Sequence, residues 1–559
     1  MTATLTINGQ SIPGQPGLSL FDHAESLGID VPTSCRKQGK CRECMLEIVE
    51  GLAALTPCTD PERHLKGNFR LACQTYVAPD QLAAAPPAHI RCHTMRRGAM
   101  RIERHALGLP VSQYLDPAVT RDGDHILLDG VEVERSSGSI HGLAMDLGTT
   151  TIVLRLLDLE SGELIADTSF ENPQRFAGSE VMSRIAYDSD HPGRLLLRTL
   201  AGYLTHAIEK FPIDPRTIYE MVVVGNSTMR DLFFRQSVHS IGQAPYRSIT
   251  EIDLAEGRRT TTALTQSGLR SLLPIHPRAR VYGAPIISGH VGADAAAAML
   301  AVDLAHEDCL VAIMDIGTNT ELILGNKDRI LAASCPAGPA FEGGAIACGM
   351  PALDGAIEEV RIDEGTGAFH CRVIGDVQPT GICGSGLIDA LSELLRTGRM
   401  NELGRFEDGP HRIVLQSGLP PAEDIYLLES DVNELAQAKG ANVAGLHVVF
   451  SSYGIDFDDI DLFYLAGGFG RHLNVDAAQR IGLIPGLDPA KVVQAGNTAI
   501  EGATIALLSR AKRAELESLV RRVEYCRLET HPSFFDFFVE GCQFKPLQSN
   551  FKEALPCPR

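Results

Sequence analysis

The sequence predicts a multidomain protein in which a small N-terminal α+β domain precedes a large α/β domain built from two similar subdomains. Three observations lead to this fold class. The chain has 559 residues, which is too long for a single hydrophobic core. Four of its cysteines occur at characteristic spacings between residues 35 and 73. The motif Asp-x-Gly-Thr-x-Thr occurs twice, each time between two apolar segments typical of strands.

The overall composition is that of an ordinary globular protein. Hydrophobic residues make up 44% of the chain and charged residues 21%. No apolar run approaches the ~18 residues of a membrane span, and residues 1–8 lack the features of a signal peptide. We therefore expect a cytoplasmic protein with no membrane segment. The formal net charge of −20 argues against nucleic acid as a partner, because phosphate contacts require clustered lysine and arginine.

Residues 1–80 are expected to form the compact α+β domain. Apolar residues alternate on both sides of Asn8-Gly9, which is a strong signal for a β-hairpin. A short amphipathic helix is expected over Ser19–Leu27, followed after the cysteine loop by a strand over residues 45–49. An Ala/Pro-rich stretch then begins residues 81–140, which we assign to a linker and a small middle region.

The cysteine pattern is Cys35-x5-Cys41-x2-Cys44-x28-Cys73. Iron–sulfur clusters take thiolate ligands, and four thiolates complete two tetrahedral irons bridged by sulfide. The first gap matches the vertebrate, adrenodoxin-like spacing, so we interpret these residues as ligands of a 2Fe–2S cluster. Zinc is the main alternative, but four-cysteine zinc sites normally contain two C-x2-C pairs. Purely structural cysteines are the other alternative, and Cys58 lies off the pattern.

The repeated motif occurs as Asp146-Leu-Gly-Thr-Thr-Thr and Asp315-Ile-Gly-Thr-Asn-Thr. A glycine at a β-turn permits close approach of a phosphate, threonine hydroxyls bond its oxygens, and a carboxylate positions Mg²⁺ or an attacking water. Two copies between apolar strands are stronger evidence than one. A third glycine element, Leu465-Ala-Gly-Gly-Phe-Gly, could accommodate an adenosine.

Two such loops facing each other across a cleft resemble the ASKHA superfamily of actin, sugar kinases and heat-shock chaperone ATPases. Together with the cysteine pattern, the chain resembles the reductive activators of corrinoid proteins, which join a 2Fe–2S domain to an ASKHA ATPase. The resemblance covers residues 1–80 and about 141–545. Further segments that fit this family are residues 172–185, 224–229, 284–285, 291–294, 335–344, 381–389 and 496–499.

The resemblance implies a ferredoxin-type (β-grasp) domain over residues 1–80 and an ASKHA domain over residues 141–559. Its subdomains would span about 141–305 and 306–545, with a C-terminal tail over 546–559. Asp146 and Asp315 would be the catalytic residues that manage Mg²⁺ and water. The remaining nucleotide site would comprise Gly148, Thr149, Thr150, Gly317, Thr318, Asn319, Thr320, Gly467, Gly468 and Gly470, with Glu321 and Glu342 as weaker candidates.

The implied activity is ATP-dependent reduction of the cobalt of a corrinoid methyl carrier from Co(II) to Co(I) in a methyl-transfer (demethylation) pathway. Plant-type clusters have potentials near −400 mV, roughly, and the Co(II)/Co(I) couple lies lower, so ATP must change the energetics. The implied cofactors are the 2Fe–2S cluster, ATP and Mg²⁺. The implied partners are the corrinoid protein, an external electron donor and, as a homodimer, a second copy of the chain.

Two other function classes are alternatives. One is a nucleotide-gated electron carrier or scaffold without corrinoid reduction, and the other is a redox-sensing small-molecule kinase. Two related families are disfavoured by the cysteines. Activators of 2-hydroxyacyl-CoA dehydratases carry a 4Fe–4S cluster and no ferredoxin domain. A second corrinoid-activator family has C-terminal 4Fe–4S motifs, whereas Cys526, Cys542 and Cys557 lack C-x2-C spacing.

Overall fold

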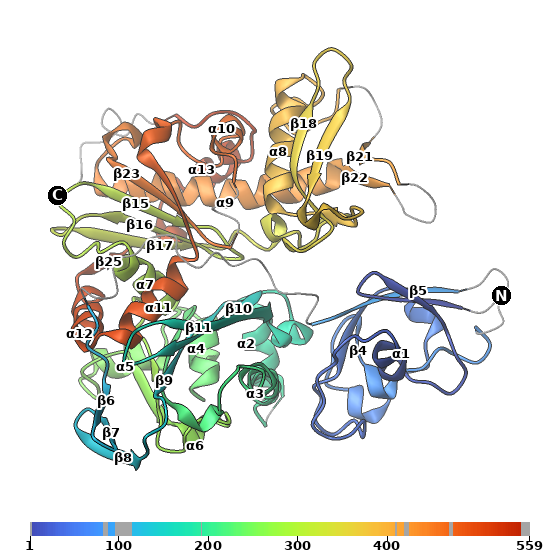
Figure 1. The fold of residues 1–559 in the computed structure, drawn as a ribbon. Helices are drawn as coiled ribbons and strands as arrows, with labels where there is room; N and C mark the ends of the chain where they lie inside the picture. Colours follow the sequence, from blue (N-terminus) through green and yellow to red (C-terminus); the bar gives the residue numbers. More distant parts are fainter. Residues whose placement is uncertain are drawn as a thin grey trace.

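The computed structural model describes residues 3–81, 88–95, 114–191, 193–407, 411–418, 424–468 and 473–548. An N-terminal domain lies beside two stacked lobes, each with a six-stranded sheet (Figure 1). Within these ranges no helix has the length and apolar character needed to cross a membrane. Gly470, Cys557 and residues 549–559 of the expected tail lie outside the described residues.

The N-terminal domain contains the hairpin and the helix that the sequence predicts. Asn8 and Gly9 both have positive φ, 48° and 82°, as a tight two-residue hairpin turn requires. The helix begins after Ser19, whose hydroxyl accepts a hydrogen bond from the N–H of Asp22 in a capping box. The elements are β1 (Thr4–Ile7), β2 (Gln10–Pro13), α1 (Leu20–Ser26), β3 (Met45–Glu50), β4 (Phe69–Leu71) and β5 (His89–Thr94).

Strand β5 lies in the middle of the N-terminal sheet, whose order is β2-β1-β5-β3-β4. It pairs in parallel with β1 and antiparallel with β3. The expected end of the domain at residue 80 is therefore too early, and the sheet extends to Thr94. The Ala/Pro-rich stretch before His89 resembles a linker in composition, but it connects two parts of one sheet.

Residues 114–140 form a three-stranded sheet that packs on the middle lobe. Its strands are β6 (Val119–Asp122), β7 (His125–Leu128) and β8 (Val131–Arg135). The hydroxyl of Tyr219 donates to Glu134, and Arg278 Nη1 donates to the carbonyl oxygen of Val133 at 3.2 Å. This region is therefore an extension of the middle lobe.

The middle lobe is built around the sheet β11-β10-β9-β12-β14-β13. Every residue of β9 and β12 is buried, which explains the nearly continuous apolar sequence of both strands. The strands are β9 (His141–Leu147), β10 (Thr151–Asp158), β11 (Leu164–Glu171), β12 (Ile218–Val224), β13 (Leu264–Ser267) and β14 (Arg280–Gly283). The helices are α2 (Val181–Asp190), α3 (Leu195–Ile208), α4 (Ser227–Phe233), α5 (Ile249–Ala255), α6 (Gly268–Ser271) and α7 (Ala293–Ala301).

The C-terminal lobe repeats this arrangement in the sheet β24-β23-β15-β16-β17-β25. In each lobe three antiparallel strands are followed by a fourth that pairs in parallel with the first, which confirms the two similar α/β subdomains. The sheet strands are β15 (Val311–Asp315), β16 (Thr320–Gly325), β17 (Ile330–Cys335), β23 (Leu462–Ala466), β24 (Val492–Gly496) and β25 (Val523–Tyr525). The outer elements are β18 (Ala356–Ile362), β19 (Phe369–Val373), β20 (Gly381–Ile382), α8 (Gly384–Arg396), β21 (Arg412–Gln416), β22 (Ile425–Leu428), α9 (Glu429–Tyr453), α10 (Val475–Arg480) and α13 (Phe534–Gly541).

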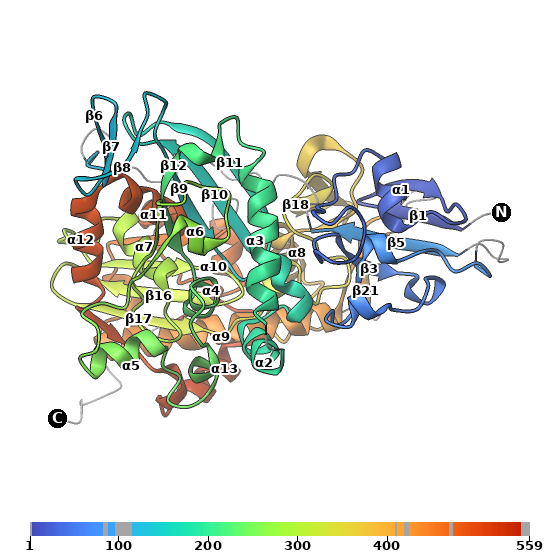
Figure 2. The same cartoon turned by 90° about the horizontal axis from the view of Figure 1, so that it is seen from below.

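Two helices late in the chain return to the middle lobe. Helix α11 (Thr498–Leu508) packs on α7, β9 and β12, and α12 (Arg510–Leu519) follows it (Figures 1 and 2). Arg513 Nη1 donates to Glu220 of β12 at 2.8 Å, and Arg155 of β10 pairs with Glu501 at 2.8 Å. The expected subdomain of residues 306–545 is therefore not continuous in space, because these helices belong to the other lobe.

The crossing of α11 and α7 depends on a glycine. A Cβ added to Gly502 would lie 2.0 Å from the carbonyl oxygen of Ala297 in α7. We expect Gly502→Ala to destabilise the protein by about 1–3 kcal/mol, because the helices must move apart. Calorimetric unfolding measures this change. Gly486→Ala is the matched control, because a Cβ there meets open space, and equal unfolding temperatures for the two variants would contradict the prediction.

Candidate cluster site and nucleotide site

The four predicted cysteine ligands lie together as two pairs. The Cys44 thiol donates to the Cys73 sulfur at 3.3 Å, and the Cys41 thiol donates to the Cys35 sulfur. Among the described residues, no three of these sulfurs lie within 4.8 Å of one another. A single zinc with bonds of about 2.3 Å would hold all four sulfurs within about 4 Å. The two pairs therefore fit two irons better than one zinc.

Backbone amides surround the sulfurs, as the polar loop sequence suggests. Their hydrogen bonds lower the pKa of Cys35 although burial opposes this change. The hydrogen bond from Cys44 lowers the pKa of Cys73 to about 6. N–H groups that favour thiolate over thiol are what an iron–sulfur site needs. The donors are Gln38, Lys40 and Cys41 to Cys35, Ser34 and Glu43 to Cys41, and Gly39 to Cys73.

The site has one buried side and one accessible side. Cys44 and Cys73 are buried, whereas Cys35 and Cys41 are half-buried. Cys58, which the sequence places off the pattern, is exposed. An electron-transfer partner can therefore approach the Cys35 and Cys41 edge.

The two Asp-motif loops face each other between the lobes. Thr150 Oγ1 of the β9–β10 loop lies 2.9 Å from Thr318 Oγ1 of the β15–β16 loop. Both hydroxyls donate to Glu342, that of Thr150 at 3.1 Å. The structure thus brings the predicted residues of both loops together, with one of the weaker carboxylate candidates between them.

Carboxylates gather in the cleft between the loops. Burial raises the pKa of Asp146 to about 7, and Asp294 contributes further. Burial raises the pKa of Asp315 to about 8, with additional repulsion from Asp294, Asp146 and Glu342. Burial, together with repulsion from Asp294 and Asp315, raises the pKa of Glu321 well above its ordinary value. Carboxylate oxygens suit a divalent cation such as Mg²⁺, and the nearby guanidinium groups of Arg175 and Arg184 partly offset the charge of Glu342.

Three asparagines tie the first loop to the ends of neighbouring elements. Asn172 Nδ2 donates to the carbonyl oxygen of Gly148 at 2.8 Å. Asn226 donates to Thr149 Oγ1 at 2.7 Å, and Asn497 donates to Asp146 Oδ2 at 2.8 Å. The three asparagines are also the N-caps of the helices that follow them. The sequence offered a signal for them, since each follows a strand and precedes a helix within a family-like segment.

The third glycine element approaches the second loop. Gly467 has φ 101°, and a Cβ there would lie 2.3 Å from the carbonyl oxygen of Ile316 and 3.1 Å from Asp315 Oδ1. Only glycine fits this position. Gly468 faces open space. Thr320 is buried, and in the part of the chain that the structure describes its hydroxyl has no protein partner. Gly317 and Asn319 lie half-buried in the second loop.

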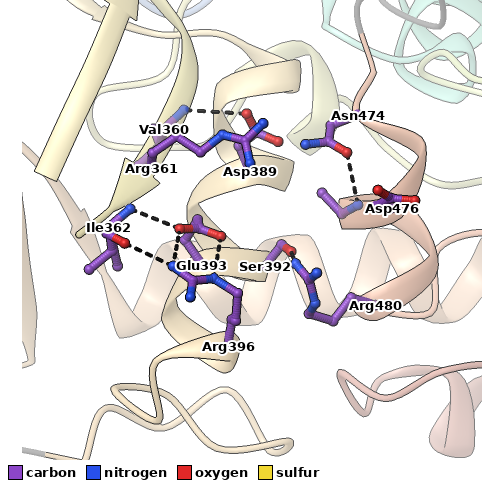
Figure 3. Close-up of a pocket in the computed structure, with 11 residues that line it drawn as sticks. Val360, Arg361, Ile362, Asp389, Ser392, Glu393, Arg396, Asn474, Asp476 and Arg480 are labelled. Carbon is purple, nitrogen blue, oxygen red and sulfur yellow. Dashed lines mark hydrogen bonds and ion pairs between the residues drawn. The ribbon is translucent and has the colours of Figure 1, made fainter. Parts of the chain in front are cut away.

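A pocket of about 200 Å³ opens between α8, β18 and α10 (Figure 3). Its wall is polar. Asp389 is 4% exposed, and within the described residues its Oδ1 has no hydrogen-bond partner. Glu393 accepts from the N–H of Ile362 at 2.8 Å and from Arg396. A buried carboxylate oxygen beside a polar pocket can accept a hydrogen bond from water or from a hydroxyl or amino group of a ligand. The sequence did not single out this pocket.

Comparison with known proteins assigns the three parts of the chain. Residues 5–78 match the 2Fe-2S iron-sulfur cluster binding domain, residues 141–307 the RACo middle region, and residues 309–554 the C-terminal domain of RACo, the ASKHA domain. The corrinoid activation enzyme RamQ of Eubacterium limosum is 28% identical over 94% of this chain and 95% of its own. The [Co(II) methylated amine-specific corrinoid protein] reductase of Methanosarcina barkeri is 25% identical over 72% of this chain and 76% of its own.

A solved structure, the reductive activator for corrinoid,iron-sulfur protein, matches with a TM-score of 0.71 and 27% identity. The match covers 97% of this chain and 98% of that one. The cysteine pairs and the facing Asp loops agree with the three family models, which match residues 5–78, 141–307 and 309–554. The chain belongs to the RACo family, since it carries a 2Fe–2S domain, the RACo middle region and the RACo C-terminal ASKHA domain.

Proposed function

We propose that this protein reduces its substrate, the Co(II) centre of a corrinoid methyl carrier, to Co(I) in a reaction driven by ATP, within a methyl-transfer (demethylation) pathway. One observation carries the proposal: a paired-cysteine loop and an acidic two-loop cleft occur in one chain, with their domains in direct contact. The names of the relatives support the substrate class. When bound, a 2Fe–2S cluster supplies single electrons at a potential near −400 mV, roughly.

The chain's own residues have separable tasks in this proposal. Asp146 and Asp315 would hold Mg²⁺ and position the attacking water, and the loop hydroxyls and amides would hold the phosphates. Gly467, which approaches the second loop, and Gly468 would border the nucleoside. Bringing the lobes together around ATP converts nucleotide binding into a change in domain position.

Electrons enter and leave at the Cys35 and Cys41 edge in this proposal. An external electron donor and the corrinoid protein use this accessible side in turn. A reducing compartment such as the cytoplasm suits the site, because ligating thiols must not form disulfides. We also propose that the protein forms a homodimer, as the family resemblance implies. Analytical sedimentation measures this oligomeric state.

The test is ATP hydrolysis by the reconstituted, anaerobically reduced protein with and without a Co(II) corrinoid protein, while the visible spectrum follows cobalt. ATP-dependent appearance of the Co(I) band supports the proposal. Nucleotide turnover without any cobalt change, across several corrinoid proteins, would contradict it and favour a nucleotide-gated electron carrier. Phosphorylation of a small molecule would favour a kinase.

The raised pKa values of Asp146 and Asp315 predict how the stability of the nucleotide-free protein depends on pH. Burial raises these values to about 7 and about 8, against about 3.9 for an unfolded aspartate. At pH values between the unfolded and the folded pKa, the folded state binds more protons than the unfolded state. The stability of the folded state therefore falls as pH rises through this interval. Bound Mg²⁺ needs ionised carboxylates and opposes this loss.

We therefore expect the melting temperature in EDTA to fall between about pH 4 and about pH 8. The gap in melting temperature between the protein in EDTA and the protein loaded with Mg²⁺ and a non-hydrolysable ATP analogue should widen over the same interval. Calorimetry at several pH values measures both. In Asp315→Asn the fall should be shallower. A gap that narrows as pH rises is incompatible with the proposed metal site.

A further inference from the structure

The N-terminal domain rests on the middle lobe through a segment that also holds the first phosphate loop. This segment, residues 172–187, includes a short 3-10 helix, η5 (Pro173–Ala177), and most of α2. At its start, the Asn172 side chain donates to Gly148 O at 2.8 Å, and its N–H donates to Thr150 O at 2.7 Å. Two hydrogen bonds therefore join Asn172 to the loop.

Three or four residues later, η5 contacts the N-terminal domain. Arg175 Nη2 lies 3.3 Å from Glu47 Oε1 of β3. The carbonyl oxygen of Phe176 accepts from the N–H of Lys66 at 3.2 Å. One short helix thus holds the loop at one end and the N-terminal domain at the other.

Helix α2 repeats this arrangement. The buried guanidinium of Arg184 donates to the carbonyl oxygen of Thr149 at 2.7 Å. Tyr187, three residues further and on the same helical face, donates its hydroxyl to the carbonyl oxygen of His64 at 2.7 Å. Both side chains are fully buried. A shift of the loop that moves Arg184 therefore moves Tyr187 as well.

The contact between residues 172–187 and the N-terminal domain includes a cluster of three packed aromatic rings. The ring of Phe176 lies edge-on to those of His64 and Tyr187, with centroids 5.7 and 5.4 Å apart. Burial lowers the pKa of His64 to about 4, so its ring packs as a neutral aromatic. Closely packed interiors transmit displacement instead of absorbing it.

A second contact joins the cysteine loop to α3, which lies on the side of the middle lobe nearest the N-terminal domain (Figure 2). Tyr203 donates its hydroxyl to the carbonyl oxygen of Glu43 at 2.6 Å, and His206 Nε2 lies 3.0 Å from Glu43 Oε2. The N–H of Glu43 in turn donates to the sulfur of Cys41. The position of the cysteine loop therefore follows the middle lobe.

We propose that residues 172–187 transmit the nucleotide state of the loop at residues 148–150 to the N-terminal domain, with Arg175 and Tyr187 as positioning residues. This inference rests on the proposed function, because it assumes that ATP occupies the cleft. Its consequence is that ATP binding sets where the cysteine loop stands relative to a docked substrate. Loss of both contacts, the Arg175–Glu47 pair and the hydrogen bond of the Tyr187 hydroxyl, uncouples the two events while leaving both sites formed.

The backbone amide of Lys66 is the reporter, because it donates across the interface to Phe176. Hydrogen–deuterium exchange of the full-length protein is measured with and without a non-hydrolysable ATP analogue. In the unmodified protein the analogue should change exchange of the Lys66 peptide by about fivefold or more. In Tyr187→Phe combined with Glu47→Gln, the change should fall below about twofold.

Lys210→Gln is the matched control. It removes an interface ion pair with Asp30 that does not pass through residues 172–187. The nucleotide-dependent change should persist in this variant. An equal loss in Lys210→Gln, or a full response in the double variant, overturns the inference. Calorimetric titration of the analogue separates the two proposals: absence of nucleotide binding refutes the proposed function, whereas binding without any change at Lys66 refutes only the coupling.

Discussion

Asp315→Asn is expected to lower ATP hydrolysis at least about 100-fold, the loss typical when one electrostatic group of a transition-state site is removed. Asp315 ends β15 at the cleft, and its carboxylate lies among Asp146, Asp294 and Glu342. The amide keeps the size of the side chain but cannot carry the charge that Mg²⁺ needs. A steady-state assay of phosphate release measures the loss, and the visible spectrum should show an intact cluster.

Asp328→Asn is the matched control for this experiment. Asp328 is exposed in the turn that joins the far end of β16 to β17, so it shares the subdomain but not the cleft. Its turnover should equal that of the unmodified protein. Unchanged turnover in Asp315→Asn would show that this carboxylate has no part in hydrolysis.

Cys73→Ala is expected to abolish cluster binding, with iron falling from about two per chain toward zero and the visible absorption lost. Cys73 is buried and pairs with Cys44, and no other thiol of the described chain approaches that pair closely enough to replace it. Cobalt reduction should fall below detection because no electron carrier remains. Nucleotide binding should persist, since the cleft lies between the other two lobes.

Cys58→Ala is the matched control for the assignment of the cluster ligands. This exposed thiol lies between the ligands in sequence but outside the pairs in space. Its variant should keep both irons and full activity. Equal iron loss in the two variants would mean that the ligand set is wrong.

Features set by local sequence were predictable. The Asn8-Gly9 turn, the helix capped by Ser19 and the two Asp-motif turns depend on neighbouring residues, and each forms where it was predicted. Strand β5 was missed because its pairing with β1 joins residues more than eighty positions apart. The Ala/Pro-rich composition before it gives no sign of the strand.

The residues of the candidate site also differ in whether the local sequence predicts them. The threonines and aspartates of the two loops could be named from the sequence, because glycine turns between apolar strands have a recognisable pattern. Asp294 and Asn497 could not be given roles, since only the fold brings α7 and α11 to the Asp146 loop. The pocket beside Asp389 arises where α8 meets α10, which are far apart in the chain.

The return of α11 to the middle lobe makes the two halves of the chain interdependent. A fragment ending near residue 308 would lack the helix that covers α7 and the Asn497 amide that binds Asp146. Neither half should be soluble when produced alone, because each would expose an apolar helix face. Co-production of both fragments should restore a noncovalent complex, in which α11 of the second fragment packs on α7, β9 and β12 of the first.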